Sequence, residues 1–131
     1  MEQADKISII DYKQTHKSGL LRLLLELHVT HFNASAPTQS LELLKEKDIK
    51  ATYKKYIEQI QNDGNWKILL AVDKKRKLIG FIIGSLKRDP DLVKSHIGVL
   101  EDWLVLVEER RKGVGMKLYT ELEKWFIEKR L

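Results

Sequence analysis

The most constraining feature of the sequence is a basic turn with two glycines, set between an apolar stretch and a helical pattern. Residues 96–107 are largely apolar and predict a strand, and from residue 114 the apolar positions recur at helical spacing. A turn that opens a helix presents free backbone N–H groups and the positive end of the helix dipole, which together bind phosphate-like anions. The sequence therefore predicts an anion site here, where glycines allow close approach of the backbone. The residues of the turn are Arg110, Arg111, Lys112, Gly113, Val114 and Gly115.

The spacing of this turn separates it from two common phosphate-binding loops. It reads Arg110-x-x-Gly113-x-Gly115 and follows a strand that contains Glu101-Asp102. It is neither the Gly-x-Gly-x-x-Gly of dinucleotide folds nor the Walker loop. It resembles the acyl-CoA-binding motif of the GNAT superfamily of N-acetyltransferases, in which an Arg/Gln-x-x-Gly-x-Gly/Ala turn follows the fourth strand. The alternative interpretation is an ordinary strand-turn-helix with a solvated turn.

The rest of the chain predicts a single α/β (α+β) domain over residues 1–131, in the order β-α-α-β-β-β-α. This order resembles the first two thirds of the GNAT fold, a mixed and mostly antiparallel sheet flanked by helices. The region from Thr38 to Ile60 reads as one long helix or as two with a break near Asp48. The other expected elements are strands at 7–12, 66–72, 77–86 and 96–107, a helix at 19–32 that is broken at 33–37, and a last helix from 114 whose buried stripe is Val114, Leu118, Leu122 and Trp125.

The resemblance leaves the C-terminal part of the family fold without a counterpart, because the family continues after the third helix with a strand, a helix and two more strands. The sequence stops at Leu131. Three explanations stay open: a fragment of a longer chain, a naturally shortened homologue, or a second copy that covers the open edge of the fourth strand. Because an unpaired apolar edge tends to recruit another strand, we expect a homodimer or oligomer.

Composition excludes several classes of protein. Hydrophobic residues make up 43% of the chain and charged residues 33%, which is typical of a globular domain. No apolar run approaches the roughly 20 residues of a membrane helix, and no signal peptide is recognisable, so we expect a cytoplasmic protein without membrane contact. The absence of cysteine excludes disulfides, thiolate zinc sites and an acyl-cysteine intermediate.

The net charge of +5 fits an anionic ligand such as coenzyme A. Acidic residues are interspersed among the basic ones, and no basic stripe with interleaved aromatic residues occurs, so a nucleic-acid-binding domain ranks last among the functions considered. The densest basic run, residues 74–77, lies in a predicted turn and reads most simply as a solvated hairpin tip.

The resemblance implies a division of the cofactor site. The turn from Arg110 to Gly115 would hold the pyrophosphate of acetyl-CoA. The backbone around Trp103, Leu104 and Val105 would bind the pantetheine and the thioester carbonyl, as the fourth strand does in the family. No residue matches the tyrosine that often serves as general acid, and Tyr119 is not assigned that role.

Glu101 and Asp102 are the candidate catalytic residues. Glu101 matches the position that accepts a proton in similar amine acetyltransferases, and Asp102 would bind a cationic amine or be structural. Because neighbours on a regular strand point to opposite faces, we expect only one of them to address a given pocket. The alternative for either carboxylate is an ion pair at the strand end.

The remaining aromatic and histidine residues carry weaker signals. We expect His28 and His31 to be capping or partly buried residues, with an acceptor pocket as the alternative, and His96 to be exposed. Trp103 and Trp125 read as core residues rather than cofactor platforms. No spacing suggests a metal site.

Together with these observations, the resemblance implies an N-acetyltransferase that moves an acetyl group from acetyl-CoA to a primary amine of a small molecule or peptide by direct attack. The alternative is a non-catalytic, CoA-binding or dimerising module on the same scaffold. No pattern in the sequence identifies the acyl acceptor.

Overall fold

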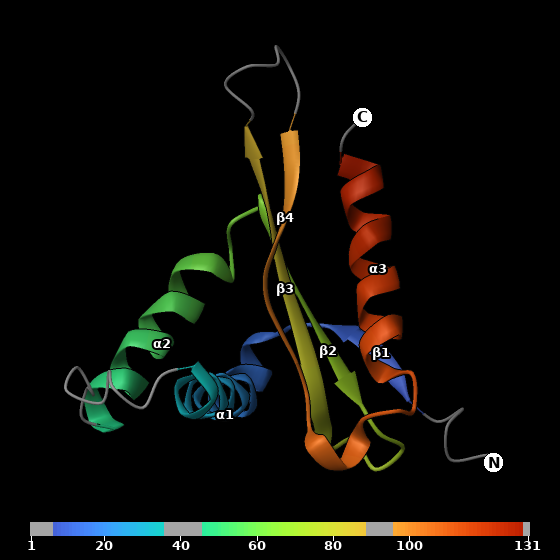
Figure 1. The fold of residues 1–131 in the computed structure, drawn as a ribbon. Coiled ribbons are helices and arrows are strands. Elements are labelled where there is room, and N and C mark those ends of the chain that lie inside the picture. Colours follow the sequence, from blue (N-terminus) through green and yellow to red (C-terminus); the bar gives the residue numbers. More distant parts are fainter. Residues whose placement is uncertain (1–6, 36–45, 89–95, 130–131) are drawn as a thin grey trace.

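Four antiparallel strands form one sheet in the order β1-β2-β3-β4, shown in Figure 1. The structure is a computed structural model, and it describes residues 7–35, 46–88 and 96–129. The strands are β1 (Ser8–Asp11), β2 (Trp66–Val72), β3 (Leu78–Arg88) and β4 (His96–Val105). The expected strands are confirmed with small shifts at their ends: β3 extends two residues further than expected, and β4 ends two residues early. Its end at Val105 leads through Leu106 into the 3-10 turn η4 (Val107–Glu109).

The helices cover both faces of the sheet. After the 3-10 turn η2 (Gln14–His16), α1 (Lys17–Ser35) and α2 (Glu46–Ile60) lie on one face, and α3 (Val114–Lys129) lies on the other (Figure 1). The described elements therefore follow the predicted order β-α-α-β-β-β-α, and the α+β fold class is confirmed.

The structure corrects one expected helix end and bears on a second. Residues 33–35 do not break the first helix, because α1 continues through Ser35. Asp48 lies exposed within α2, where charged Lys and Glu residues are compatible with a helix, so it is not the cap of a second helix. The residues that would distinguish one long helix from two, 36–45, fall outside the described residues. The expected start of the second helical region at Thr38 also falls outside the described residues.

The core lies on both sides of β3, whose residues 79–85 are all buried. The predicted stripe of α3, namely Val114, Leu118, Leu122 and Trp125, is buried and packs on the sheet. A Cβ added at Gly84 would come within 2.8 Å of Leu122, so glycine at this position lets α3 approach β3 closely.

Among the residues that the structure describes, β4 pairs only with β3 and is an edge strand of the sheet. Large apolar side chains are exposed along it, including Ile97, Leu100 and Trp103. No described helix has the length and apolar character needed to cross a membrane.

Candidate functional site

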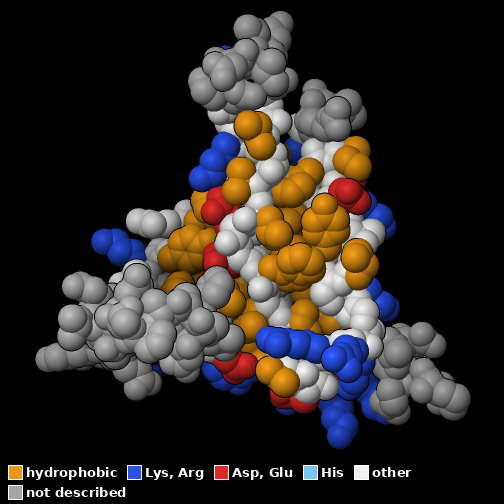
Figure 2. Space-filling view, in the orientation of Figure 1, with side chains coloured by type: hydrophobic (Ala, Val, Ile, Leu, Met, Phe, Trp, Pro, Cys, Tyr) orange, Lys and Arg blue, Asp and Glu red, His pale blue; other side chains and the backbone are white. Residues whose placement is uncertain are grey.

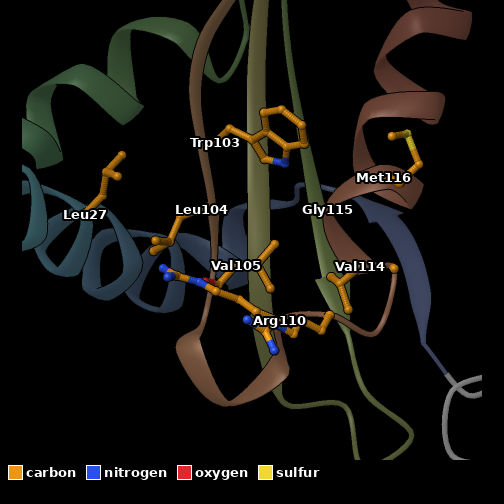
Figure 3. Close-up of a pocket in the computed structure, with 10 residues that line it drawn as sticks. Leu27, Trp103, Leu104, Val105, Arg110, Val114, Gly115 and Met116 are labelled. Carbon is orange, nitrogen blue, oxygen red and sulfur yellow. The ribbon is translucent and has the colours of Figure 1, made fainter.

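A cavity of about 580 Å³ opens between the end of β4 and the start of α3 (Figure 3). The sequence-predicted cofactor residues lie around it together, with the exception of Lys112, which lines a neighbouring cavity. Leu27 and Met116 also line the cavity and were not anticipated. Their only sequence signals are the apolar face of the first helix and the position directly after the glycine turn. The lining residues are Leu27, Trp103, Leu104, Val105, Arg110, Arg111, Gly113, Val114, Gly115 and Met116.

The turn that forms one wall of this cavity is fixed by backbone and side-chain contacts. Arg110 folds back so that its Nε donates a hydrogen bond of 2.9 Å to the carbonyl oxygen of Val105. Arg111 and Gly113 have positive φ angles of 67° and 81°, and the N–H of Lys117 donates to the Gly113 carbonyl at 3.0 Å, which begins α3. The left-handed backbone at Gly113 is the conformation that glycine adopts without strain.

The start of α3 has open space in front of it. A Cβ added at Gly113 would meet no atom within 4 Å. The first N–H groups of a helix have no partner within that helix, and here they lie beside Arg110 and Arg111. This combination of space, free N–H groups and positive charge fits a phosphate group, so the residues present suit the pyrophosphate of coenzyme A.

Trp103 is not a core residue, contrary to the expectation from its apolar surroundings. Its side chain is 38% exposed and stacks on Tyr119 of α3, with ring centroids 5.8 Å apart and an interplanar angle of 26°. The reason is its place on the edge strand, where the sheet offers no further neighbour among the described residues. Trp125, in contrast, is 8% exposed and belongs to the core as predicted.

Glu101 and Asp102 lie on the same face of the sheet, so the prediction that they face opposite sides is wrong. Ile83 pairs with Asp102, whereas the next residue, Gly84, pairs with Leu100, and Glu101 is therefore the extra residue of a β-bulge. A bulge interrupts the alternation of side chains along a strand. Both carboxylates consequently address the face that carries α1 and α2.

Glu101 contacts two side chains of β3. Its Oε2 accepts a hydrogen bond of 2.6 Å from the Ser85 hydroxyl and lies 3.4 Å from Nζ of Lys87. Ser85 is the buried polar residue of the described core, and the carboxylate satisfies its hydroxyl. The Lys87 ammonium offsets the charge of Glu101 at a position that is still partly open to solvent. An ion pair, the alternative that the sequence left open for either carboxylate, is thus present at Glu101, although within β4 rather than at its end.

Asp102 is bound by α2. The Tyr56 hydroxyl donates a hydrogen bond of 2.9 Å to Oδ2 of Asp102. Burial raises the pKa of Tyr56 strongly, and the negative charge of Asp102, its hydrogen bond and the charge of Glu101 raise this pKa further. Burial, and then the charge of Asp102, also raise the pKa of Tyr53.

The face of the sheet that carries the two carboxylates, called the polar face below, also includes a histidine of α1. Nδ1 of His28 lies 3.2 Å from the Tyr53 hydroxyl, and the two rings meet edge to face. His28 is half-buried, as expected, and His96 is exposed, while the side chain of His31 lies outside the described residues. The described residues contain no group of three or more His, Asp or Glu side chains placed to hold a metal ion.

The cavity and the polar face are close to each other across the edge of β4. Trp103 and Val105 point towards α3, whereas Asp102 points towards α2. The cavity is nevertheless lined by Leu27 of α1, so it reaches around the edge of β4 from one face to the other. A ligand in the cavity could therefore present a group to the side on which the two carboxylates lie.

Comparison with known proteins agrees with this architecture. The profile of the Acetyltransferase (GNAT) family matches residues 21–131. Among curated proteins, none matches the sequence of this chain.

Solved structures of acetyltransferases share the fold at low sequence identity. An acetyltransferase of the GNAT family from Staphylococcus aureus Mu50 is 20% identical with a TM-score of 0.68, covering 94% of this chain and 68% of its own. The aminoglycoside 6'-N-acetyltransferase AAC(6')-Ih from Acinetobacter baumannii is 20% identical with a TM-score of 0.64, covering 91% and 70%. AAC(6')-Iy, solved with a bisubstrate analogue of CoA and acetylneamine, is 20% identical with a TM-score of 0.61, covering 94% and 73%. The matched profile spans most of the chain, which therefore belongs to the GNAT family of acetyltransferases.

Proposed function

We propose that the protein transfers an acetyl group from acetyl-CoA to a primary amine of a small molecule or peptide, by direct attack of the amine. The observation that carries this proposal is the cavity between β4 and α3, which combines the glycine turn with the edge of β4 and reaches towards a face with two carboxylates. A neighbour of the same fold binds a conjugate of CoA, and such neighbours are named for amine acceptors.

The coenzyme would lie along the turn and the edge of β4. Arg110, Arg111 and the first N–H groups of α3 would hold the pyrophosphate. The backbone of Trp103, Leu104 and Val105 would bind the pantetheine and orient the thioester carbonyl by hydrogen bonds. Bound acetyl-CoA supplies the activated acetyl group. Since the chain has no cysteine, an acyl-cysteine intermediate is excluded.

The two carboxylates, Glu101 and Asp102, would bind and deprotonate the amine acceptor. An alkylammonium group must lose a proton before it can attack a carbonyl carbon, and Glu101 would accept this proton, directly or through water. Asp102, held by Tyr56, would bind the positive charge of the acceptor and position it. The bulge is essential to this proposal, because it brings both carboxylates to one face.

Calorimetric titration with acetyl-CoA tests the coenzyme site. We expect the wild-type protein to bind, and the double variant Arg110→Ala/Gly113→Ala to lose roughly tenfold or more in affinity, since it loses a charge-assisted contact and gains strain in the turn. Arg88→Ala/Gly64→Ala is the matched control, because Arg88 is exposed at the end of β3 and a Cβ at Gly64 would meet nothing within 4 Å. Equal affinity in all three proteins would argue against the turn as the binding site.

An amine panel, including aminoglycosides and peptide amines, tests the reaction by following release of free CoA thiol. Glu101→Gln should lower kcat by roughly 10²–10⁴-fold if Glu101 is the base. Unchanged turnover in this variant would remove Glu101 from the mechanism.

The second candidate function is a coenzyme-binding module without catalysis. The observation that favours it is the engagement of Glu101 by both Ser85 and Lys87. Tight binding of acetyl-CoA by the folded wild-type protein, without acetylation of any amine, would support this candidate over the enzyme.

A further inference from the structure

The basic turn between β2 and β3 is not an isolated hairpin tip. With Lys112 of the β4–α3 turn, it encloses a cavity of about 370 Å³, which is lined by Ile7, Asp73, Lys74, Lys75, Glu109 and Lys112. Figure 2 shows the lysine and arginine side chains gathered at this end of the molecule, below the apolar surface between β4 and α3. Two basic segments that are far apart in the sequence therefore meet in space.

The β2–β3 turn has a defined conformation. Oδ1 of Asp73 accepts hydrogen bonds from the backbone N–H groups of Lys75 and Lys77, at 2.9 and 2.8 Å. The N–H of Arg76 donates to the Asp73 carbonyl at 2.9 Å, and Asp73 pairs with Lys77 through the backbone. These bonds hold the Lys74 and Lys75 backbone in one place beside the cavity.

The acidic residues around this cavity already have partners. Asp73 accepts the backbone hydrogen bonds of its own turn, and Glu109 pairs with Lys112 at 3.2 Å. The ion pairs found within residues 7–35, 46–88 and 96–129 involve neither Lys74 nor Lys75. With three lysines against two carboxylates, the lining of the cavity carries an excess of positive charge, which suits an anionic group.

The cavity adjoins the proposed coenzyme site. Arg110, Arg111 and Gly113 line the larger cavity, while Lys112, between them in the chain, lines the basic one. Coenzyme A carries two separate anionic groups, a pyrophosphate and a ribose 3'-phosphate. The glycine turn at the start of α3 suits the first group, and nearby cations would favour binding of the second.

We propose that Lys74 and Lys75, together with Lys112, bind the ribose 3'-phosphate of acetyl-CoA, an inference that rests on the proposed function. The β2–β3 turn thereby makes the protein selective for coenzyme A over donors that contain only the pantetheine and pyrophosphate. Lys112 belongs to the coenzyme site in this arrangement, but contacts a different phosphate from Arg110.

The test compares acetyl-CoA with acetyl-dephospho-CoA, which lacks only the 3'-phosphate, in calorimetric titrations. The wild-type protein should prefer acetyl-CoA by roughly tenfold, as expected for charge-assisted contacts near the surface. Lys74→Gln/Lys75→Gln should lose this preference while keeping the affinity for acetyl-dephospho-CoA. Lys54→Gln/Lys55→Gln, which removes the same charge from an exposed part of α2, should keep it.

Three results would overturn the proposal. An equal loss of affinity for both ligands in Lys74→Gln/Lys75→Gln would show a general charge effect. An undiminished preference for acetyl-CoA would show that other residues bind the 3'-phosphate. A preference that persists while the variant loses affinity for a fluorescent oligonucleotide would assign the basic face to nucleic acid. These results leave the coenzyme site intact, whereas failure of the folded wild-type protein to bind either ligand would defeat the proposed function as well.

Discussion

The Tyr56 hydroxyl on α2 donates a hydrogen bond of 2.9 Å to the Asp102 carboxylate on β4. The bond connects a helix to the strand that carries the candidate catalytic residues, and the two partners are 46 positions apart in the sequence. The bulge at Glu101 places both carboxylates on one face of the sheet, and the bond from Tyr56 holds the Asp102 side chain in its orientation there. The acceptor side of the site thus depends on α2 as well as on β4.

The ionisation of Tyr56 gives the first prediction. Burial, and then the charge and hydrogen bond of Asp102, raise the pKa of Tyr56 above its ordinary value of 10.0. Tyr56 should therefore stay protonated in the folded protein at pH about 10 to 11, where an unperturbed tyrosine ionises. The rise in tyrosinate absorbance over this range should be the same in the wild-type protein and in Tyr56→Phe. A smaller rise in the variant, by one tyrosine, would contradict the raised pKa.

The same raised pKa predicts a dependence of stability on pH. The folded state holds the Tyr56 proton more tightly than the unfolded state, so this contribution is complete below pH about 10 and is lost as pH rises towards the folded pKa. Urea unfolding at pH 9 and pH 11 should show a larger loss of unfolding free energy in the wild-type protein than in Tyr56→Phe. An equal loss in both proteins would show that Tyr56 does not contribute to the fall in stability at alkaline pH.

Asp102→Asn should weaken binding of the acceptor without changing the affinity for the coenzyme. The substitution removes the charge that would bind the acceptor ammonium, and hydrogen bonds to charged groups contribute about 1.5–3 kcal/mol, roughly a ten- to hundredfold rise in acceptor KM. The Kd for acetyl-CoA should not change, because Asp102 faces α2 and the turn lies beyond the end of β4. Asp48→Asn, an exposed substitution on α2, is the control. A parallel rise in both constants would indicate a general structural defect.

The features that could be predicted from the sequence are those built from neighbouring residues. The glycine turn and the buried stripe of α3 depend on local spacing, and the predicted stripe is confirmed residue by residue. The shared face of Glu101 and Asp102 could not be predicted, because alternation along a strand holds only until a bulge interrupts it. The polar contacts of Tyr53 and Tyr56 could not be predicted either, because their partners come from α1 and β4.

Exposure was harder to predict than secondary structure for the same physical reason. Trp103 has apolar neighbours in sequence, as a core residue does, but its burial depends on which strands flank β4. Lys112 is a further example. It lies within the motif, yet its side chain turns to Glu109 and the β2–β3 turn rather than to the larger cavity.

Gly80→Ala should destabilise the junction of β3 and β4. A Cβ at Gly80 would lie 2.9 Å from the carbonyl oxygen of Leu104, a backbone atom that cannot move without disturbing the paired strands. We expect a loss of about 1–3 kcal/mol in the free energy of unfolding, measured by urea denaturation. Gly64→Ala is the control, because a Cβ there would meet no atom within 4 Å. Similar midpoints for Gly80→Ala and the wild-type protein would contradict the tight packing of this junction.

Trp103 should report the binding of the coenzyme. Its indole lines the cavity and stacks on Tyr119, whereas Trp125 is buried in the core and Trp66 packs against Tyr56. Titration with acetyl-CoA should change the tryptophan fluorescence of the wild-type protein, and Trp103→Phe should abolish this change while calorimetry still detects binding. An undiminished fluorescence response in Trp103→Phe would place the ligand near another tryptophan.

The exposed edge of β4 predicts self-association of the 131-residue chain. Within the described part of the sheet, β4 pairs on one side only, and Ile97 and Leu100 expose 47% and 42% of their surface along it. Such an edge recruits a second strand unless charged side chains protect it. Light scattering should therefore show a dimer or larger species, and Ile97→Lys/Leu100→Lys should shift it to the monomer. Val29→Lys/Ile127→Lys changes exposed apolar residues of α1 and α3 and should leave the association intact. A wild-type protein that is monomeric at all concentrations would refute pairing through β4.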